Sequence, residues 1–132
     1  MVGQYAALDI VEGFKVPNLG LYTTATVLLP HLRKLAEKNP EAHPALFVTS
    51  GAIIHQPFAT VFSLSMAKAA QASLAKLLAA EHKNVVHVAL VTIGGQVSPD
   101  EEVNNPENIA TKFRALYVQK KGHWDQEMKC GW

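Results

Sequence analysis

The hydrophobic pattern of the chain centres on residues 45–93, where two apolar runs flank an alanine-rich segment. Residues 45–54 are almost continuously apolar and too short for a helix, which is typical of a strand buried on both faces. Residues 62–81 are rich in alanine, leucine, lysine and glutamate without glycine or proline, which predicts a helix. A second apolar run at 85–93 completes a strand–helix–strand unit, whose two strands we expect to be parallel.

Helical patterns are predicted on both sides of this unit. From Leu19 to Lys38, leucine and alanine form one broad apolar face, and Pro30 is expected to kink the helix or mark its weakest turn. A last helix is predicted from about Pro106 to Lys120, because proline suits the first helical position and apolar residues follow on one side.

The remaining segments carry weaker signals. Residues 1–13 indicate at most one helical turn, and Ser98 with Glu101 three residues later is typical of a helix N-terminus. The predicted order of elements is that of an α/β protein with parallel strands and long flanking helices. At 132 residues, the chain is expected to form one domain over residues 1–132.

Composition narrows the possible functions. A net charge of +1 argues against a nucleic-acid partner, and Lys120-Lys121 is interpreted as a solvated helix end. Cys130 is the only cysteine, so an intrachain disulfide or a cysteine-based zinc site is excluded. We find neither a secretory signal pattern nor an apolar run of membrane-spanning length. The chain is therefore expected to be cytoplasmic, without a membrane partner.

Four short motifs follow one another in a characteristic order. An apolar strand ends in Thr49-Ser50, and the next helix opens with Ser63-Leu64-Ser65-Met66-Ala67-Lys68-Ala69-Ala70. Leu29-Pro30-His31-Leu32 precedes that strand, and Ile93-Gly94-Gly95-Gln96-Val97 ends the following one. In this order and spacing, the chain from about Phe14 onward resembles the C-terminal portion of a short-chain dehydrogenase/reductase. Ile109-Ala110 and the Trp124-Asp125-Gln126-Glu127 region are similar to a pattern of fungal members.

The resemblance implies a partial Rossmann-like, three-layer fold and an NAD(P)-dependent oxidoreduction of a small carbonyl or alcohol substrate. It implies that Ser50 binds the substrate oxygen. It implies that Lys68 binds the nicotinamide ribose and lowers the pKa of a catalytic tyrosine. Gly94, Gly95 and Val97 correspond to the loop over the nicotinamide.

The sequence departs from the family pattern at several of these positions. Leu64 stands at the tyrosine position, four residues before Lys68, so the proton donor is missing. If Gly20 matches the family glycine, Pro17 replaces the family asparagine and Asn18 is displaced by one. No glycine-rich phosphate-binding turn occurs in the chain, and the cofactor-binding half of the family fold is expected to be absent. NAD or NADP binding is therefore expected to be weak or absent.

Each candidate residue also has an ordinary structural interpretation. Lys68 fits a solvated lysine near a helix N-terminus, and Ser50 fits a turn-forming hydroxyl. His55 is the nearby side chain best suited to proton transfer, but nothing in the sequence fixes its geometry. The other histidines lie in separate elements without metal-ligand spacing, so no metal site is predicted; they are His31, His43, His82, His87 and His123.

Two functions remain open at this point. The chain can be a diverged oxidoreductase with a small-molecule substrate, or a non-catalytic pseudoenzyme or truncated remnant that acts through association. In either case we expect a homo-oligomer formed through helices 19–38 and 62–81. The strand at 45–54 is expected to have one unpaired edge, because the strands beyond it in the family are not encoded.

Overall fold

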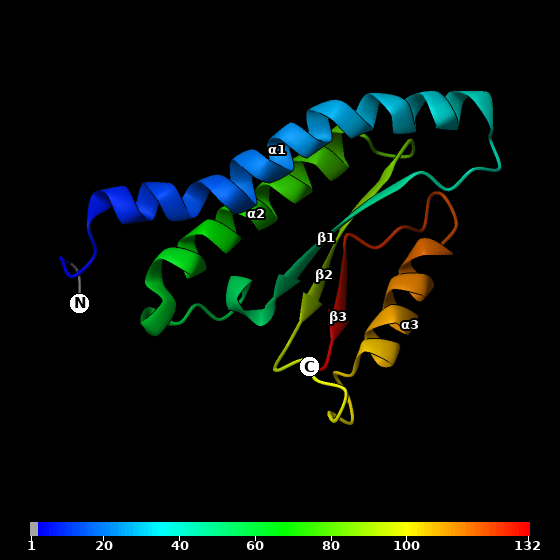
Figure 1. The fold of residues 1–132 in the computed structure, drawn as a ribbon. Helices are drawn as coiled ribbons and strands as arrows, with labels where there is room; N and C mark the ends of the chain where they lie inside the picture. Colours follow the sequence, from blue (N-terminus) through cyan, green and yellow to red (C-terminus); the bar gives the residue numbers. More distant parts are fainter. Residues whose placement is uncertain (1–2) are drawn as a thin grey trace.

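In the computed structural model, which describes residues 3–132, three parallel strands form one sheet with helices on both of its faces (Figure 1). The strands are β1 (Ala45–Gly51), β2 (His87–Ile93) and β3 (Glu127–Cys130), in the spatial order β1-β2-β3. The helices are α1 (Ala7–Lys38), α2 (Phe62–Glu81) and α3 (Pro106–Tyr117); the short 3₁₀ helices η1 (Ala52–Ile54) and η2 (Ala59–Val61) lie between β1 and α2. The predicted α/β class is confirmed.

The sheet has a separate hydrophobic core on each face. Towards α1 and α2, Val48 and Leu90 pack against Ala72 of α2. Towards α3, the fully buried Val91 packs against Leu116. Figure 1 shows α1 and α2 together on one side of the strands and α3 on the other. Because β2 lies between two strands and two helix layers, its nearly continuous apolar sequence is the expected one for a central parallel strand.

Helix α1 begins at Ala7, so the predicted start at Leu19 is wrong by about three turns. Contacts with the beginning of α2 explain the difference. Tyr5 stacks on Phe62 with ring centroids 5.1 Å apart, and Gly13 lies against Ser63. Apolar residues in this part of α1 remain largely exposed. The segment therefore lacks the one-sided apolar pattern that predicts a packed helix. Packing against α2 stabilises these turns where propensity alone does not.

The predicted strand at 45–54 is too long, because β1 ends at Gly51 and the chain turns into η1. Gly51 pairs with Ile93, the last residue of β2, so no partner strand continues beyond that point. The second strand begins at His87 rather than at residue 85. Val85 and Val86 instead donate their N–H groups to the His82 carbonyl and close the turn after α2.

The C-terminal third contains three further corrections. Ser98 does not begin a helix; it forms a turn in which its hydroxyl accepts a hydrogen bond from Asp100 N–H. The N-cap of α3 is Asn105, whose side-chain oxygen accepts from Asn108 N–H at 2.9 Å, and α3 ends at Tyr117 rather than near residue 120. The sequence analysis also missed β3, a strand of four residues that pairs with β2 from Leu90 onward.

Candidate functional site

The carboxyl ends of the three strands meet at one edge of the sheet, where open α/β sheets usually bind ligands. Ser50 lies opposite Thr92 in the β1–β2 register. Gly94 donates its N–H to the Cys130 carbonyl at 2.8 Å, which places the predicted nicotinamide loop beside the end of β3. The structure therefore brings Ser50 and Gly94 to the same edge. Val97 lies further along an exposed part of the loop.

Gly95 has a structural requirement for glycine. Its φ of 125° disfavours any other residue, and a Cβ there would lie 3.2 Å from the side-chain nitrogen of Asn104. Asn104 is buried and donates to the Gly94 carbonyl at 3.0 Å. The conformation of the Gly94-Gly95 loop is therefore fixed by Asn104, independently of any cofactor.

The Ser50 hydroxyl is buried at the end of β1, and it has no hydrogen-bond partner among residues 3–132. A turn-forming serine would bond to nearby backbone, so the turn interpretation does not fit. Leaving a buried hydroxyl unpaired costs about 1–3 kcal/mol. Ser50 therefore offers a polar group that a ligand oxygen could satisfy.

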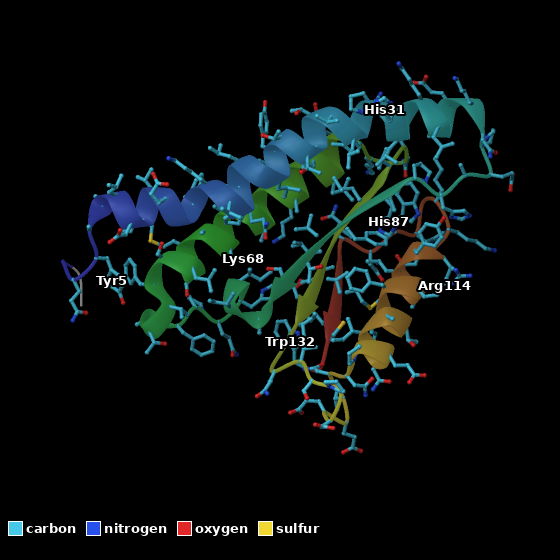
Figure 2. The ribbon with its side chains drawn as sticks, viewed as in Figure 1. Tyr5, His31, Lys68, His87, Arg114 and Trp132 are labelled. Atoms are coloured by element: carbon cyan, nitrogen blue, oxygen red, sulfur yellow. The ribbon has the colours of Figure 1, made fainter. Side chains whose placement is uncertain are left out.

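Lys68 points towards the carboxyl end of β1 from the second turn of α2 (Figure 2). Its ammonium donates to the side-chain oxygen of Gln71 at 2.6 Å and to the Thr49 carbonyl at 3.4 Å. Gln71 in turn donates to the Pro17 carbonyl at 2.9 Å, which links α2 to α1. Burial lowers the pKa of Lys68. The solvated-lysine interpretation is therefore wrong, since Lys68 is half-buried and engaged by neighbouring acceptors.

Two side chains near Lys68 on α2, Leu64 and Ser65, offer no hydroxyl that is free to donate a proton. Leu64 is 51% exposed on the surface of α2. The Ser65 hydroxyl donates to the Phe58 carbonyl and accepts from the Phe58 N–H. Asn18 is buried between the helices, where its side chain donates to the Ala67 carbonyl at 3.0 Å. Although displaced by one position in the sequence, this asparagine still contacts α2 beside Lys68.

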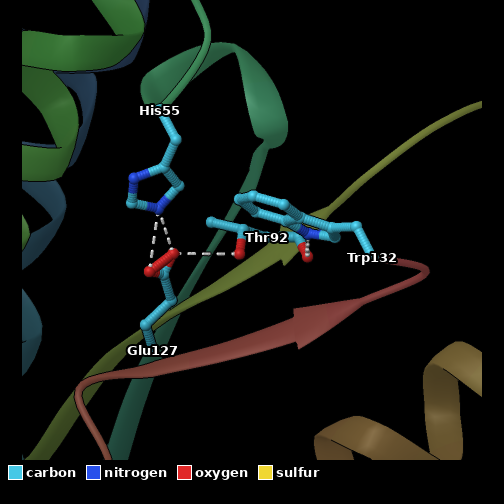
Figure 3. Close-up of polar contacts among 4 residues, drawn as sticks. All are labelled: His55, Thr92, Glu127 and Trp132. Atoms are coloured by element: carbon cyan, nitrogen blue, oxygen red, sulfur yellow. Dashed lines mark hydrogen bonds and ion pairs between the residues drawn. The ribbon is translucent and has the colours of Figure 1, made fainter.

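His55 and Glu127 form a hydrogen-bonded pair at the same edge of the sheet (Figure 3). The His55 Nε2 nitrogen lies 2.5 Å and 3.0 Å from the two carboxylate oxygens of Glu127. The Thr92 hydroxyl donates to the nearer of these oxygens at 3.1 Å, so β2 and β3 together orient the carboxylate. The structure therefore fixes the position of His55, which the sequence alone does not.

Sequence reasoning missed Glu127 and Thr92 because the strand that carries Glu127 is short. Its only signal is the alternation of charged and apolar residues in Glu-Met-Lys-Cys, which puts Glu127 and Lys129 on one face of the sheet. His55 and Glu127 are 72 positions apart in the sequence. No local spacing could have paired them.

The contact between His55 and Glu127 predicts a modest energetic coupling between the two side chains. In a double-mutant cycle with His55→Ala and Glu127→Ala, we expect about 1 kcal/mol of coupling in the free energy of unfolding, measured by urea denaturation. The more exposed pair Glu12–Lys15 on α1 is the matched control and should couple by less than about 0.5 kcal/mol. Equal coupling in both cycles would contradict the oriented geometry at His55.

Trp132 completes this edge. Its indole N–H donates to the Thr92 carbonyl at 3.3 Å, and its ring lies 5.2 Å from the His55 ring, centroid to centroid. The Lys129 ammonium lies over the indole, 4.4 Å from the ring centroid. Gly94 allows this position, since a side chain at Gly94 would overlap the indole.

Within residues 3–132, no three histidine, cysteine, aspartate or glutamate side chains lie together as a set of metal ligands. No helix in that part of the chain combines the length and the apolar character needed to cross a membrane.

No family model and no curated protein matches the sequence. The fold does match a crystal structure of a short-chain dehydrogenase from Rhodopseudomonas palustris, with a TM-score of 0.68 and 18% sequence identity. The match covers 96% of this chain and 53% of that one, so the chain spans about half the length of the dehydrogenase. The three-stranded parallel sheet with its flanking helices therefore corresponds to part of a short-chain dehydrogenase Rossmann fold, as the sequence resemblance implied.

Proposed function

We propose that this chain is a non-catalytic unit with a short-chain dehydrogenase-like fold, which acts through association and does not itself carry out NAD(P)-dependent oxidoreduction. The observation that carries the proposal is the turn of α2 between Leu64 and Lys68. An exposed leucine occupies the position of the proton donor, and the ammonium of Lys68 is bound by Gln71 at 2.6 Å.

The chemistry of hydride transfer explains why this turn matters. Reduction of a carbonyl leaves a developing oxyanion, which a positioned acid must protonate. Leucine cannot do so, and Ser65 beside it is an unassisted hydroxyl that already donates to Phe58. The Lys68 ammonium has three N–H donors, and the contacts to Gln71 and Thr49 already use two of them. The geometry at this turn therefore disfavours catalysis.

A second copy of the chain is the partner that we propose, with α1 and α2 as the contact surface. The outer face of α1 exposes several large apolar side chains, among them Val16 at 82% and Val27 at 59% of their surface. An open apolar groove runs along α1 and includes Val27; it is lined by Leu19, Gly20, Thr23, Thr24, Val27 and Leu28. Contiguous apolar surface of this kind usually marks an interaction site.

The second candidate is oxidation or reduction of a small carbonyl or alcohol compound with NAD or NADP. It is favoured by the unpaired hydroxyl of Ser50, next to the Thr49 carbonyl that Lys68 contacts. His55, which Glu127 orients, would be the side chain at this edge best suited to supply a proton.

Cofactor titration and one substitution separate the two candidates. We expect calorimetric titration of NADH and NADPH into the chain to give dissociation constants far above 1 µM. A dissociation constant of about 1 µM would correspond to a binding free energy of about −8 kcal/mol. We expect Leu64→Tyr to show no carbonyl reduction above the matched control Leu64→Phe, which adds the ring without the hydroxyl. Micromolar binding, or turnover by the tyrosine variant alone, would instead support the oxidoreductase.

A further inference from the structure

The indole of Trp132 packs closely against the carboxyl edge of the sheet. Four groups contact it, and together we call them the indole subsite: Gly94, the Thr92 carbonyl, the His55 ring and the Lys129 ammonium. We propose that the indole subsite is a binding site for planar heteroaromatic rings that carry an N–H donor, and that Trp132 is an internal plug occupying it.

The shape of the subsite supports a flat ring. Gly94 has no Cβ, and its N–H is bonded to the Cys130 carbonyl, so the backbone of the loop lies close to the end of β3. A side chain at Gly94 would occupy the space of the indole. The ring of Trp132 therefore rests directly against loop backbone, an approach that only glycine allows.

The polar and charged groups define the chemistry of the ring. The Thr92 carbonyl accepts the indole N–H, which requires a donor in the plane of the ligand. Lys129 lies 4.4 Å from the ring centroid, a geometry that favours an electron-rich aromatic face through cation–π attraction. The centroid of the His55 ring lies 5.2 Å from that of the indole, and the two ring planes are tilted by 50°. Glu127 holds His55 in that position.

Trp132 lies at the surface, where a competing ring can reach the indole subsite. It remains 47% exposed, and its only hydrogen bond given by the structure is the 3.3 Å contact to Thr92. A buried core tryptophan would have most of its surface covered, whereas this one covers an edge. An external ring of the same chemistry can therefore compete with Trp132 for the indole subsite. This inference goes beyond the proposed function, because Trp132 can occupy the subsite whether or not the chain is catalytic.

Free indole is the probe that tests the plug. We expect the folded Trp132→Ala variant to bind indole at least tenfold more tightly than the unsubstituted chain, as measured by ligand-observed NMR or calorimetry. N-Methylindole, which cannot donate to Thr92, should bind that variant at least threefold more weakly than indole. Equal affinity of the two chains for indole, or no binding by the folded variant, would overturn the proposal.

A second variant tests the same subsite with Trp132 in place. In a Trp124→Phe background, where Trp132 is the only tryptophan, Gly94→Ala should expel the indole and raise its acrylamide quenching about twofold. Gln96→Ala, at an exposed position of the same loop, is the control and should leave the quenching unchanged. Unchanged quenching in Gly94→Ala would overturn the plug.

The outcomes keep the plug separate from the proposed function. Indole binding by Trp132→Ala without NADH binding supports both proposals. Micromolar NADH binding by that variant together with indole binding would support the plug and overturn the non-catalytic assignment.

Discussion

Replacing Leu90 with alanine should lower the free energy of unfolding by about 3 kcal/mol, and the melting temperature by about 10 °C. Leu90 is 1% exposed at the centre of β2, where it packs against Val48, Ala72 and Ala75. The substitution leaves a cavity between the sheet and α2 that small alanine neighbours cannot fill. Urea denaturation and thermal unfolding followed by circular dichroism measure both quantities.

Leu77→Ala is the matched control for this prediction. Leu77 lies on the outer side of α2 and is 66% exposed, so the same substitution should change stability by less than about 0.5 kcal/mol. Both variants are compared at the same low protein concentration. A similar loss of stability in both would contradict the placement of Leu90 in the core.

The central unit of the fold is predictable from sequence because its signals are local. The helix expected at 62–81 is α2 with the same ends, since alanine and leucine favour helix throughout and Gly and Pro are absent. The apolar runs around it become β1 and β2, paired in parallel as expected. Burial on both faces requires such runs, so the pattern and the fold agree.

The parts that were missed depend on contacts between distant segments. The first turns of α1 are stabilised by the stack of Tyr5 on Phe62, which no helical periodicity in residues 7–18 indicates. Strand β3 exists because β2 offers it a free edge, and four alternating residues are too few to predict a strand alone. Both segments depend on a partner elsewhere in the chain, and their own residues carry too little local pattern to predict them.

The same distinction applies to the candidate site. The resemblance placed Ser50 and Lys68 near each other, and the structure puts both at the carboxyl end of β1. It gave no sign that Gln71 binds the Lys68 ammonium or that Trp132 covers Gly94. Both contacts engage residues that the resemblance assigns to cofactor binding, Lys68 and Gly94. The proposals of a non-catalytic unit and of a plug both follow from groups that a motif comparison does not contain.

The outer face of α1 leads to the prediction that the chain self-associates. Residues 18, 25 and 29 are buried against the rest of the fold, so Val16, Gly20, Thr23 and Val27 form a stripe on the opposite side of the helix. The small residues in the stripe allow two helices to approach closely, and the valines supply apolar surface. Sedimentation should show the average mass rising with concentration from 14.4 kDa towards about twice that value.

Charges placed on the stripe should disrupt this association without unfolding the chain. We expect Val16→Glu/Val27→Glu to remain monomeric at concentrations where the unsubstituted chain is dimeric, because both positions are exposed in the single chain. Val118→Glu, at a half-exposed position just after α3, is the control and should leave the dimer intact.

If the stripe variant still forms large species, association runs through the outer edge of β1. That edge pairs with no other strand among residues 3–132 and carries no charge or proline to discourage pairing. A mass of 14.4 kDa at every concentration would contradict both routes.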